Sequence, residues 1–464
     1  MGISCSRRRV FLFALLLLVV AFLPAVKIVS PLLPRKIDLE PEVRRAEFAD
    51  VPRLASRNRN KVLLLAVDGT SWNVLDPLLE SGELPNIAAL IGRGTHGGLK
   101  SLEVMKSPVI WTTMLTGCMP EKHGIIDFLI EGKPPRSYQR RTPALWNMIG
   151  EAKSSASIGF WATWPPEPVN GFMISDYVGM RSEEDTTEEF RRMAESLTHP
   201  PGLMGEIARE GDLRDKQACI DEFYEKFTRG PVSEEEGREL FGSWLDTYAL
   251  IYQQDVMFKD IARYLVARYH PDLTGVYFRG IDSVQHLFWA FREPEKFEAI
   301  PAAAVERYGD VIDDYYRLQD AWIGELCALV DRDTTVILVS DHGFKAKPLE
   351  RYRKNRDSPW FHLSGDHDTH GVIIMSGPPI KKGYTLPGAR VEDLAPTVLY
   401  LMGFPVSDDM DGTVLTSAFT PSYKSSHPVY TIARYPRERR EAQGTVGSLD
   451  DDARKRLKAL GYIQ

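Results

Sequence analysis

The sequence predicts an α/β fold with a mostly parallel central sheet between layers of helices. Three short apolar runs each lead to an aspartate at or near their ends: KVLLLAVDG from Lys61, TGVYFRGID from Thr274 and TTVILVSDH from Thr334. An unbroken apolar run of this length is typical of a strand that is buried on both faces of a parallel sheet. Such sheets place their ligand sites at the carboxyl ends of their strands. We therefore expect the three strand ends to form one functional edge.

The composition is that of a large globular protein. The chain has 464 residues, of which 43% are hydrophobic and 26% are charged, and its formal net charge is −7. This length suffices for one large domain with insertions, and the mildly acidic balance argues against binding to a nucleic acid polymer. The cysteines are far apart and lack CxxC spacing, so the sequence predicts buried thiols rather than a disulfide framework or a cysteine metal site. They are Cys5, Cys118, Cys219 and Cys327.

Residues 1–30 are expected to lie outside the fold. Arginines at positions 7–9 precede an apolar segment from Val10 to Val26, which has about the minimum length that spans a bilayer. This pattern predicts a signal peptide or an uncleaved N-terminal membrane anchor. Pro24 and Val26 fit a small-residue cleavage site poorly, which favours the anchor. The arginines would then stay in the cytoplasm, and the rest of the chain would lie outside it, tethered to the membrane or secreted.

Composition divides the rest of the chain into segments. Residues 31–60 are rich in proline and charge and are predicted to form a linker. Residues 61–180 and 271–416 carry the strand signals and are predicted to be two parts of one core. Residues 181–270 are acidic and favour helices, with almost no strand signal, which predicts an inserted helical cap over the strand ends. Residues 417–464 form a C-terminal tail with a basic patch.

Capping residues predict where the core helices begin and end. One helix is expected between Pro85 and Gly94. A second is expected to run to Gly117, with Ser107 as its N-cap and Pro108 as its first residue. Further helices are expected after Thr142, over 233–269 as a pair, over 304–330 and over 393–402. Residues 157–166 are expected to form a strand that runs into a proline-rich turn, and 372–375 a further strand.

The residues at the strand ends have the chemistry of metal ligands. Asp282 is followed one helical turn later by His286, and Asp341 is followed directly by His342. Taken singly, each is more often a turn, cap or core residue; as a set, carboxylates and imidazoles suit Zn²⁺ or a similar divalent ion. Three aspartates and three histidines are enough for two metals, an arrangement that assists phosphoryl transfer. The six residues are Asp68, Asp282, His286, Asp341, His342 and His367.

Five segments, taken as an ordered set, resemble the alkaline phosphatase superfamily. They are VDG at Asp68, SPVIWTTMLTGCMPEKHGI from Ser107, GIDSVQH from Gly280, SDHGF from Ser340 and GDHDTHG from Gly365. They are most similar to the type I phosphodiesterase/nucleotide pyrophosphatase branch of that superfamily. The resemblance implies a mixed, mostly parallel sheet between helical layers, with two zinc ions.

The resemblance also implies a role for each residue. One metal would be held by Asp282, His286 and His367, and the other by Asp68, Asp341 and His342. Ser107 would be the nucleophile and would bind the second metal. Thr112 is the alternative nucleophile, and His370 is expected either behind the ligands or at the rim of the site rather than among the ligands.

Two features near Ser107 depart from related families. The pyrophosphatases have an asparagine shortly after the nucleophile, which helps to bind a phosphate oxygen, whereas this chain has Ile110. That donor must come from elsewhere, or the substrate differs from a nucleotide. The sulfatases need a cysteine or serine followed two residues later by proline and then arginine. No arginine follows Ser107, which argues against formylglycine chemistry.

We therefore predict a metal-dependent hydrolase of phosphate esters that prefers diesters and acts through a phosphoserine intermediate. Its substrate would be a small phosphate ester, a nucleotide or a lipid head group. The helical cap would select the leaving group, and Trp111, Trp161 and Trp164 are either walls of its pocket or, more simply, core residues. One alternative is a phosphotransferase that uses a glycan or lipid acceptor. The other, a non-catalytic binding protein, is disfavoured because all six ligand positions are intact.

Overall fold

The central sheet is mixed, and its middle is parallel. In the described part of the chain its strand order is β12-β3-β11-β8-β2-β7-β4-β5-β6, with β13 paired to β3. The parallel strands are β8 (Thr335–Val339), β2 (Val62–Val67), β7 (Leu273–Phe278), β4 (Ser155–Ile158) and β5 (Gly171–Ile174). The other strands are β3 (Gly94–Lys100), β6 (Thr198–His199), β11 (His370–Ser376), β12 (Tyr384–Thr385) and β13 (Ala389–Arg390). This architecture confirms the predicted fold class.

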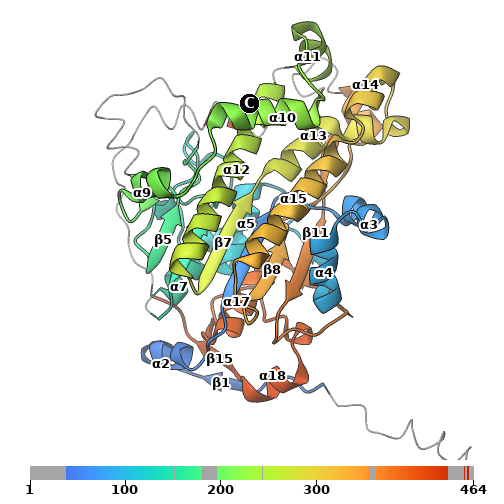
Figure 1. Cartoon of the computed structure of the whole chain (residues 1–464). Helices are drawn as coiled ribbons and strands as arrows, with labels where there is room; N and C mark the ends of the chain where they lie inside the picture. The colour runs from blue at the N-terminus through green and yellow to red at the C-terminus, as the bar shows by residue number, and fades with distance from the viewer. Residues whose placement is uncertain are drawn as a thin grey trace, which may run out of the picture. The chain divides into compact units, whose positions relative to one another are not determined.

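Helices cover both faces of the sheet because the central strand is apolar on both. Alternate residues of β2 enter two different hydrophobic clusters. One cluster includes α4 (Pro85–Arg93), α12 (Trp244–Tyr269), α13 (Gly280–Arg292) and α15 (Val311–Ala328), and the other includes α5 (Ser107–Thr116), α7 (Leu145–Ile149) and α17 (Leu394–Met402). In Figure 1, α12 and α15 cross in front of the sheet. A strand buried on both faces is what a continuous apolar run predicts.

The computed structural model describes residues 38–150, 152–179, 196–242, 244–354 and 362–436, together with 454, 457 and 458. The predicted membrane segment, Cys5 and most of the basic patch in the tail lie outside these residues. Within them, no helix combines the length and the apolar character needed to cross a membrane. Cys118 and Cys219 are buried free thiols, and Cys327 is a half-buried one.

Helix ends agree with most of the capping predictions. α4 ends at Gly94, and α5 and α17 end at Gly117 and Gly403, whose φ angles of 68° and 81° are left-handed. The predicted start of α5 is wrong by one residue, because Lys106 is the N-cap and Ser107 is the first helical residue. The Lys106 carbonyl accepts the first helical hydrogen bonds, so the Ser107 hydroxyl is not used for capping.

The helix predicted over 304–330 is interrupted. It consists of α14 (Ala302–Tyr308) and α15, with a break at Gly309 and Asp310. A Cβ atom on Gly309 would lie 2.7 Å from the Val305 carbonyl oxygen, so the chain turns at a residue that only glycine can occupy without rearrangement.

The segment predicted as a helical cap contains both peripheral and core helices. It holds α9 (Leu203–Glu210), α10 (Lys216–Phe227), α11 (Glu234–Leu240) and α12. The pair of helices expected over 233–269 is confirmed as α11 and α12. However, α12 packs against β7 and β4, so it belongs to the helical layer on the sheet. The predicted domain boundaries stay predictions.

The remaining elements surround this core. The other helices are α2 (Val51–Ser56), α3 (Trp72–Glu80), α6 (Pro120–His123), α16 (Leu349–Lys354) and α18 (Pro421–Ser426). Among the residues that the structure describes, two smaller sheets consist of β1 (Val43–Arg45) with β15 (Val429–Ile432) and β14 (Val406–Ser407), and of β9 (Gly343–Ala346) with β10 (Gly365–Asp368).

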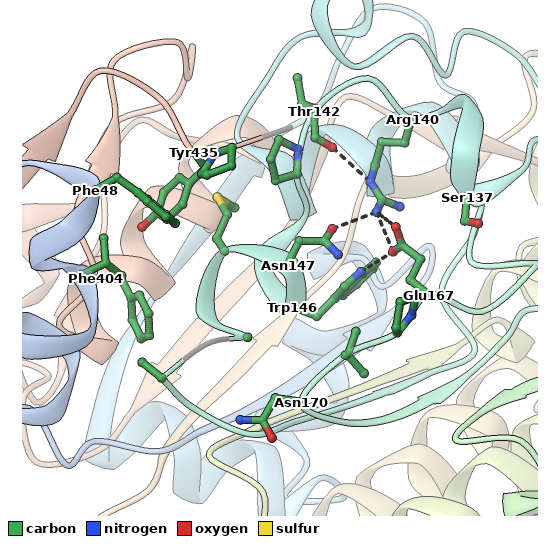
Figure 2. A pocket seen from close by; sticks show the side chains of 18 of the residues that line it. Phe48, Ser137, Arg140, Thr142, Trp146, Asn147, Glu167, Asn170, Phe404 and Tyr435 are labelled. Atoms are coloured by element: carbon green, nitrogen blue, oxygen red, sulfur yellow. Dashed lines mark hydrogen bonds and ion pairs between the residues drawn. The ribbon is translucent and has the colours of Figure 1, made fainter. Parts of the chain in front are cut away.

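A buried ion pair lines a cavity of about 330 Å³ beside α7. Arg140 Nη2 donates to both Glu167 carboxylate oxygens, at 2.7 and 2.6 Å, and Trp146 Nε1 donates to Glu167 Oε2 at 2.6 Å (Figure 2). The two charged side chains are only 4% and 2% exposed. Their charges are satisfied by one another, and the predicted ligands lie elsewhere.

Candidate active site

Three adjacent strands deliver the predicted aspartates to one edge of the sheet. β2 lies between β8 and β7 and pairs with both up to their carboxyl ends. Asp68 directly follows β2, Asp341 follows β8 after one residue, and Asp282 lies in the first turn of α13, just after β7. All three carboxylates are fully buried. The common edge expected from the apolar runs is therefore present.

The predicted histidines come from a helix, the end of a central strand and a short antiparallel strand. His286 lies on α13, His342 follows β8, and His367 lies on β10. The Nδ1 atom of His286 lies 3.3 Å from Gly365 O, and that of His342 lies 3.1 Å from Gly343 O. A backbone carbonyl that holds Nδ1–H orients the ring and leaves Nε2 as the available ligand atom.

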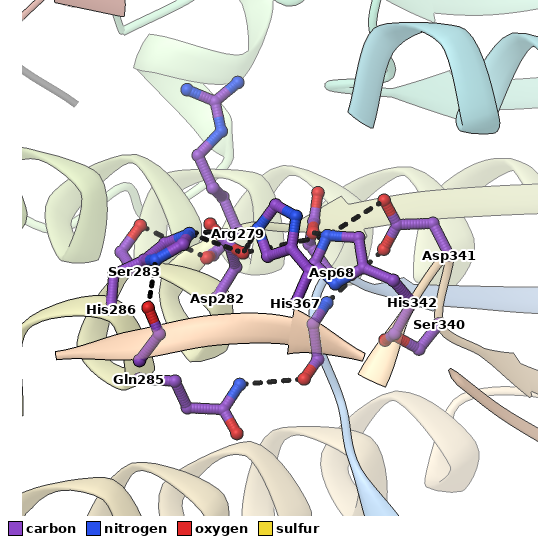
Figure 3. Close-up of polar contacts among 12 residues, drawn as sticks. Asp68, Arg279, Asp282, Ser283, Gln285, His286, Ser340, Asp341, His342 and His367 are labelled. Carbon is purple, nitrogen blue, oxygen red and sulfur yellow. Dashed lines mark hydrogen bonds and ion pairs between the residues drawn. The ribbon is translucent and has the colours of Figure 1, made fainter. Parts of the chain in front are cut away.

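The six side chains form two neighbouring groups (Figure 3). Within each group, one potential ligand atom from every residue lies within 4.8 Å of the others. The first group is Asp282, His286 and His367, and the second is Asp68, Asp341 and His342. The groups touch, because the rings of His342 and His367 stack with centroids 3.8 Å apart. We name these sets the first and second ligand groups.

The atoms that face one another in the second ligand group fit a cation. His342 Nε2 lies 3.3 Å from Asp68 Oδ1 and 3.5 Å from Asp341 Oδ2. All three atoms are buried and have no hydrogen-bond partner. Buried polar atoms are rarely left in this state, and a divalent ion with oxygen and nitrogen ligands would satisfy all of them.

Electrostatics in the second ligand group favour the same occupant. Burial and the neighbouring Asp68 carboxylate raise the pKa of Asp341 well above its ordinary value. Burial alone would lower the pKa of His342, but the Asp341 and Asp68 carboxylates raise it to about 10. The group therefore attracts positive charge, in the form of protons or of a metal cation.

Ser107 is the one hydroxyl of α5 that is left for chemistry. Its side chain is fully buried at the first position of the helix, and its Oγ has no hydrogen-bond partner. Thr112 Oγ1 donates to Pro108 O at 2.7 Å, and Thr113 and Thr116 also donate to the carbonyl one turn earlier. Such bonds are typical of hydroxyl groups inside helices. Of the four hydroxyl groups of α5, only that of Ser107 is therefore without a hydrogen-bond partner.

Trp111 connects Ser107 to the second ligand group. It lies one turn after Ser107 on α5, so the two side chains share a face of the helix. Trp111 Nε1 donates to Asp68 Oδ2 at 3.1 Å, and the Tyr277 hydroxyl donates to the same oxygen. Burial, together with the Asp68 carboxylate, raises the pKa of Tyr277 well above its ordinary value, so this hydroxyl remains a donor at neutral pH.

The tryptophans considered as pocket walls are core residues. Trp111, Trp161 and Trp164 are 0%, 4% and 3% exposed. His370 is exposed and belongs to neither ligand group. Ile110 is fully buried and its side chain can donate no hydrogen bond to a phosphate.

Sequence reasoning missed two residues that shape the site. Gly69 has a φ of 70°, and a Cβ atom there would lie 2.9 Å from Asp282 Cα, so glycine allows β2 and α13 to approach. Gln285 Nε2 donates to Gly69 O at 2.7 Å, and the Tyr316 hydroxyl donates to Gln285 Oε1 at 3.0 Å. Gly69 could have been found in the sequence, because it is a glycine directly after an aspartate at a strand end. No local pattern marks Gln285.

A buried carboxylate on α12 holds the start of α13. Asp255 accepts hydrogen bonds from the backbone nitrogens of Arg279 and Gly280, at 2.9 and 2.8 Å, just before Asp282. Burial raises the pKa of Asp255 to about 7. Because this value lies above that of the unfolded chain, the group favours folding at low pH, and this contribution is lost as the pH rises toward 7.

We expect Asp255→Asn to change how stability depends on pH. The variant should be less stable than the wild type, since an amide cannot accept both backbone bonds. The difference in unfolding free energy between wild type and variant should be larger at pH 5 than at pH 8 by roughly 3 kcal/mol. The reason is that the Asp255 carboxyl has a pKa of about 7 in the folded protein and of about 3.9 in the unfolded chain. Urea unfolding of both proteins at the two pH values measures this. An advantage that is equal at both values would contradict the shifted pKa.

One of two comparisons of the sequence with known proteins finds a match. A model of the type I phosphodiesterase/nucleotide pyrophosphatase family matches residues 62–398. No match is found among curated protein sequences.

Several solved structures are distantly similar. For human ectonucleotide pyrophosphatase/phosphodiesterase 5 the TM-score is 0.43 at 13% identity, over 78% of this chain and 100% of that one. For a putative sulfatase from Bacteroides thetaiotaomicron it is 0.47 at 14% identity, over 79% and 75%. For an inactive form of the murine ectonucleotide pyrophosphatase/phosphodiesterase 5 in complex with AMP it is 0.40 at 13% identity, over 74% and 95%.

Proposed function

The chain belongs to the type I phosphodiesterase/nucleotide pyrophosphatase family and is a phosphoric ester hydrolase, and we propose that it cleaves phosphodiesters with two divalent metals and a serine nucleophile. One observation carries this proposal. Two touching groups of buried carboxylates and of buried or half-buried imidazoles lie beside the helix that starts with a buried hydroxyl free of hydrogen bonds. Neither a structural ion pair nor a helix cap needs this combination.

The two ligand groups would each hold one ion, for which Zn²⁺ suits the mixture of carboxylate and imidazole. When bound, the ions would supply Lewis-acid stabilisation of the attacking and leaving oxygens. Ser107 Oγ would form a bond to phosphorus while the bond from phosphorus to the leaving oxygen breaks, and the Ser107 proton would pass through solvent to that leaving oxygen, which departs as the alcohol. The start of α5 would favour the negative charge on that oxygen. Water would then attack phosphorus, restore the Ser107 hydroxyl and release the phosphate monoester.

The proposed substrate is a small phosphodiester, such as a nucleotide or a lipid head group. Zn²⁺-reconstituted protein should hydrolyse bis-p-nitrophenyl phosphate faster than p-nitrophenyl phosphate, lose activity on chelation with EDTA and regain it with Zn²⁺. Added glycerol should leave the ratio of nitrophenol to nitrophenyl phosphate at one, whereas a phosphotransferase would form a glycerol diester. Activity that survives complete chelation would contradict the proposal.

We also propose that the apolar segment from Val10 to Val26 exports the protein and tethers it to the membrane, so that the site lies outside the cytoplasm. Alkaline extraction of membranes should leave the anchored protein in the pellet. Complete release into the supernatant would contradict the anchor.

A further inference from the structure

One oxygen of Asp68 receives two buried hydrogen bonds from two different elements. Trp111 Nε1 on α5 and the Tyr277 hydroxyl on β7 both donate to Asp68 Oδ2. The Tyr277 hydroxyl in turn accepts a hydrogen bond from Trp161 Nε1 at 2.8 Å. The rings of Trp111 and Tyr277 meet edge to face, with centroids 5.3 Å apart. Both donors are thus held rigidly by packing, and so is the carboxylate.

The two oxygens of Asp68 are left in different situations. Oδ2 is occupied by the two donors, whereas Oδ1 has no hydrogen-bond partner and lies 3.3 Å from His342 Nε2. Figure 3 shows Asp68 beside His342 and Asp341. A carboxylate held in this way offers one oxygen, in a fixed direction, to an ion in the second ligand group.

We propose that Trp111 and Tyr277 are positioning residues that make Asp68 a one-oxygen metal ligand and that Trp111 also holds Ser107 against it. This inference rests on the proposed function. Tyr277 belongs to β7, the strand next to β2 in the sheet, and not to the helix that carries Ser107. Its hydrogen bond therefore positions Asp68 without positioning Ser107. Trp111 belongs to the helix that begins with Ser107 and shares a face with it, so its bond to Asp68 ties nucleophile and ligand together.

The two donors should therefore differ in a measurable way. Trp111→Phe and Tyr277→Phe each remove one donor and keep an aromatic ring, and each is expected to lower Zn²⁺ affinity about tenfold or more. Isothermal titration of metal-free protein with Zn²⁺ measures this directly. At saturating Zn²⁺, Tyr277→Phe should recover the wild-type kcat on bis-p-nitrophenyl phosphate. Trp111→Phe should stay about tenfold lower, because the helix that carries Ser107 is no longer tied to Asp68.

Trp146→Phe provides a matched control. Trp146 Nε1 also donates to a buried carboxylate, Glu167, and its ring also packs against Phe160, as that of Trp111 does. Trp146 lines the cavity beside α7 together with Glu167 (Figure 2) and is not a member of either ligand group. This variant should lower the melting temperature of the metal-free protein about as much as Trp111→Phe does and leave the Kd for Zn²⁺ unchanged.

Each outcome bears on a separate part of the inference. The inference would be overturned if Trp111→Phe and Tyr277→Phe both bound Zn²⁺ as tightly as the wild type does. It would also be overturned if the control Trp146→Phe lost as much Zn²⁺ affinity as these two variants. If Trp111→Phe recovered the wild-type kcat at saturating Zn²⁺, the proposed role of Trp111 in positioning Ser107 would be overturned. Should Trp111→Phe fail to fold, Tyr277→Phe, which loses a single oxygen atom, still tests the affinity. A wild-type protein that binds no Zn²⁺ would instead overturn the proposed function, and this inference with it.

Discussion

Replacing Ser107 with alanine is expected to lower hydrolysis of bis-p-nitrophenyl phosphate by at least about 1,000-fold, because the reaction loses its nucleophile. The side chain is small, is fully buried and makes no hydrogen bond, so its loss should leave the fold and both ligand groups intact. Steady-state kinetics of Zn²⁺-loaded protein measures the loss. Mass spectrometry of acid-quenched wild-type protein should find a phosphate on the peptide that contains Ser107.

Thr112→Val is the control for this experiment. The Thr112 hydroxyl donates to Pro108 O, which leaves it poorly disposed to attack a substrate. The variant keeps the branched shape of the side chain and should retain activity within several-fold of the wild type. Loss of activity in Thr112→Val together with wild-type activity in Ser107→Ala would move the nucleophile to Thr112.

Asp282→Asn is expected to remove the metal from the first ligand group and to lower activity by about 1,000-fold or more. Asp282 Oδ1 lies 3.4 Å from His286 Nε2, 3.4 Å from His367 Nε2 and 3.8 Å from His342 Nε2, so it touches both ligand groups. Burial would raise the pKa of Asp282, but His286 and His367 hold it well below its ordinary value. Asp282 is therefore negatively charged, and the Asp282→Asn substitution removes this charge from the first ligand group.

Metal content measured by plasma mass spectrometry should fall from two Zn²⁺ per chain to one in Asp282→Asn. Asp368→Asn serves as the comparison, because Asp368 lies next to His367 on β10 but pairs with Lys345 at 3.0 Å and belongs to neither ligand group. It should keep both ions. Two ions and full activity in Asp282→Asn would contradict the role assigned to this carboxylate.

Much of this site was visible in the sequence because its signals are local. An apolar run that ends on Asp68 or Asp341 marks both a buried strand and the residue at its carboxyl end. The spacing of Asp282 and His286 places both on one turn of a helix. Parallel pairing of β2 with β7 and β8 then brings these ends together, as predicted.

The remaining features depend on contacts between distant segments. Trp111 and Tyr277 lie 43 and 209 residues from Asp68, and no spacing rule relates them to it. The position of α12 on the sheet also depends on packing, because it is fixed by contacts with β7 and β4 rather than by a local pattern. The start of α5 was misplaced because a serine before a proline is typical of an N-cap, whereas Lys106 provides the cap here.

Diffraction from Zn²⁺-reconstituted crystals, measured on both sides of the zinc absorption edge, is the most direct test of a two-metal centre beside Ser107. Two anomalous peaks are expected, one among Asp282, His286 and His367 and one among Asp68, Asp341 and His342, with Ser107 Oγ beside the second. A single peak, or peaks outside these two groups, would contradict it.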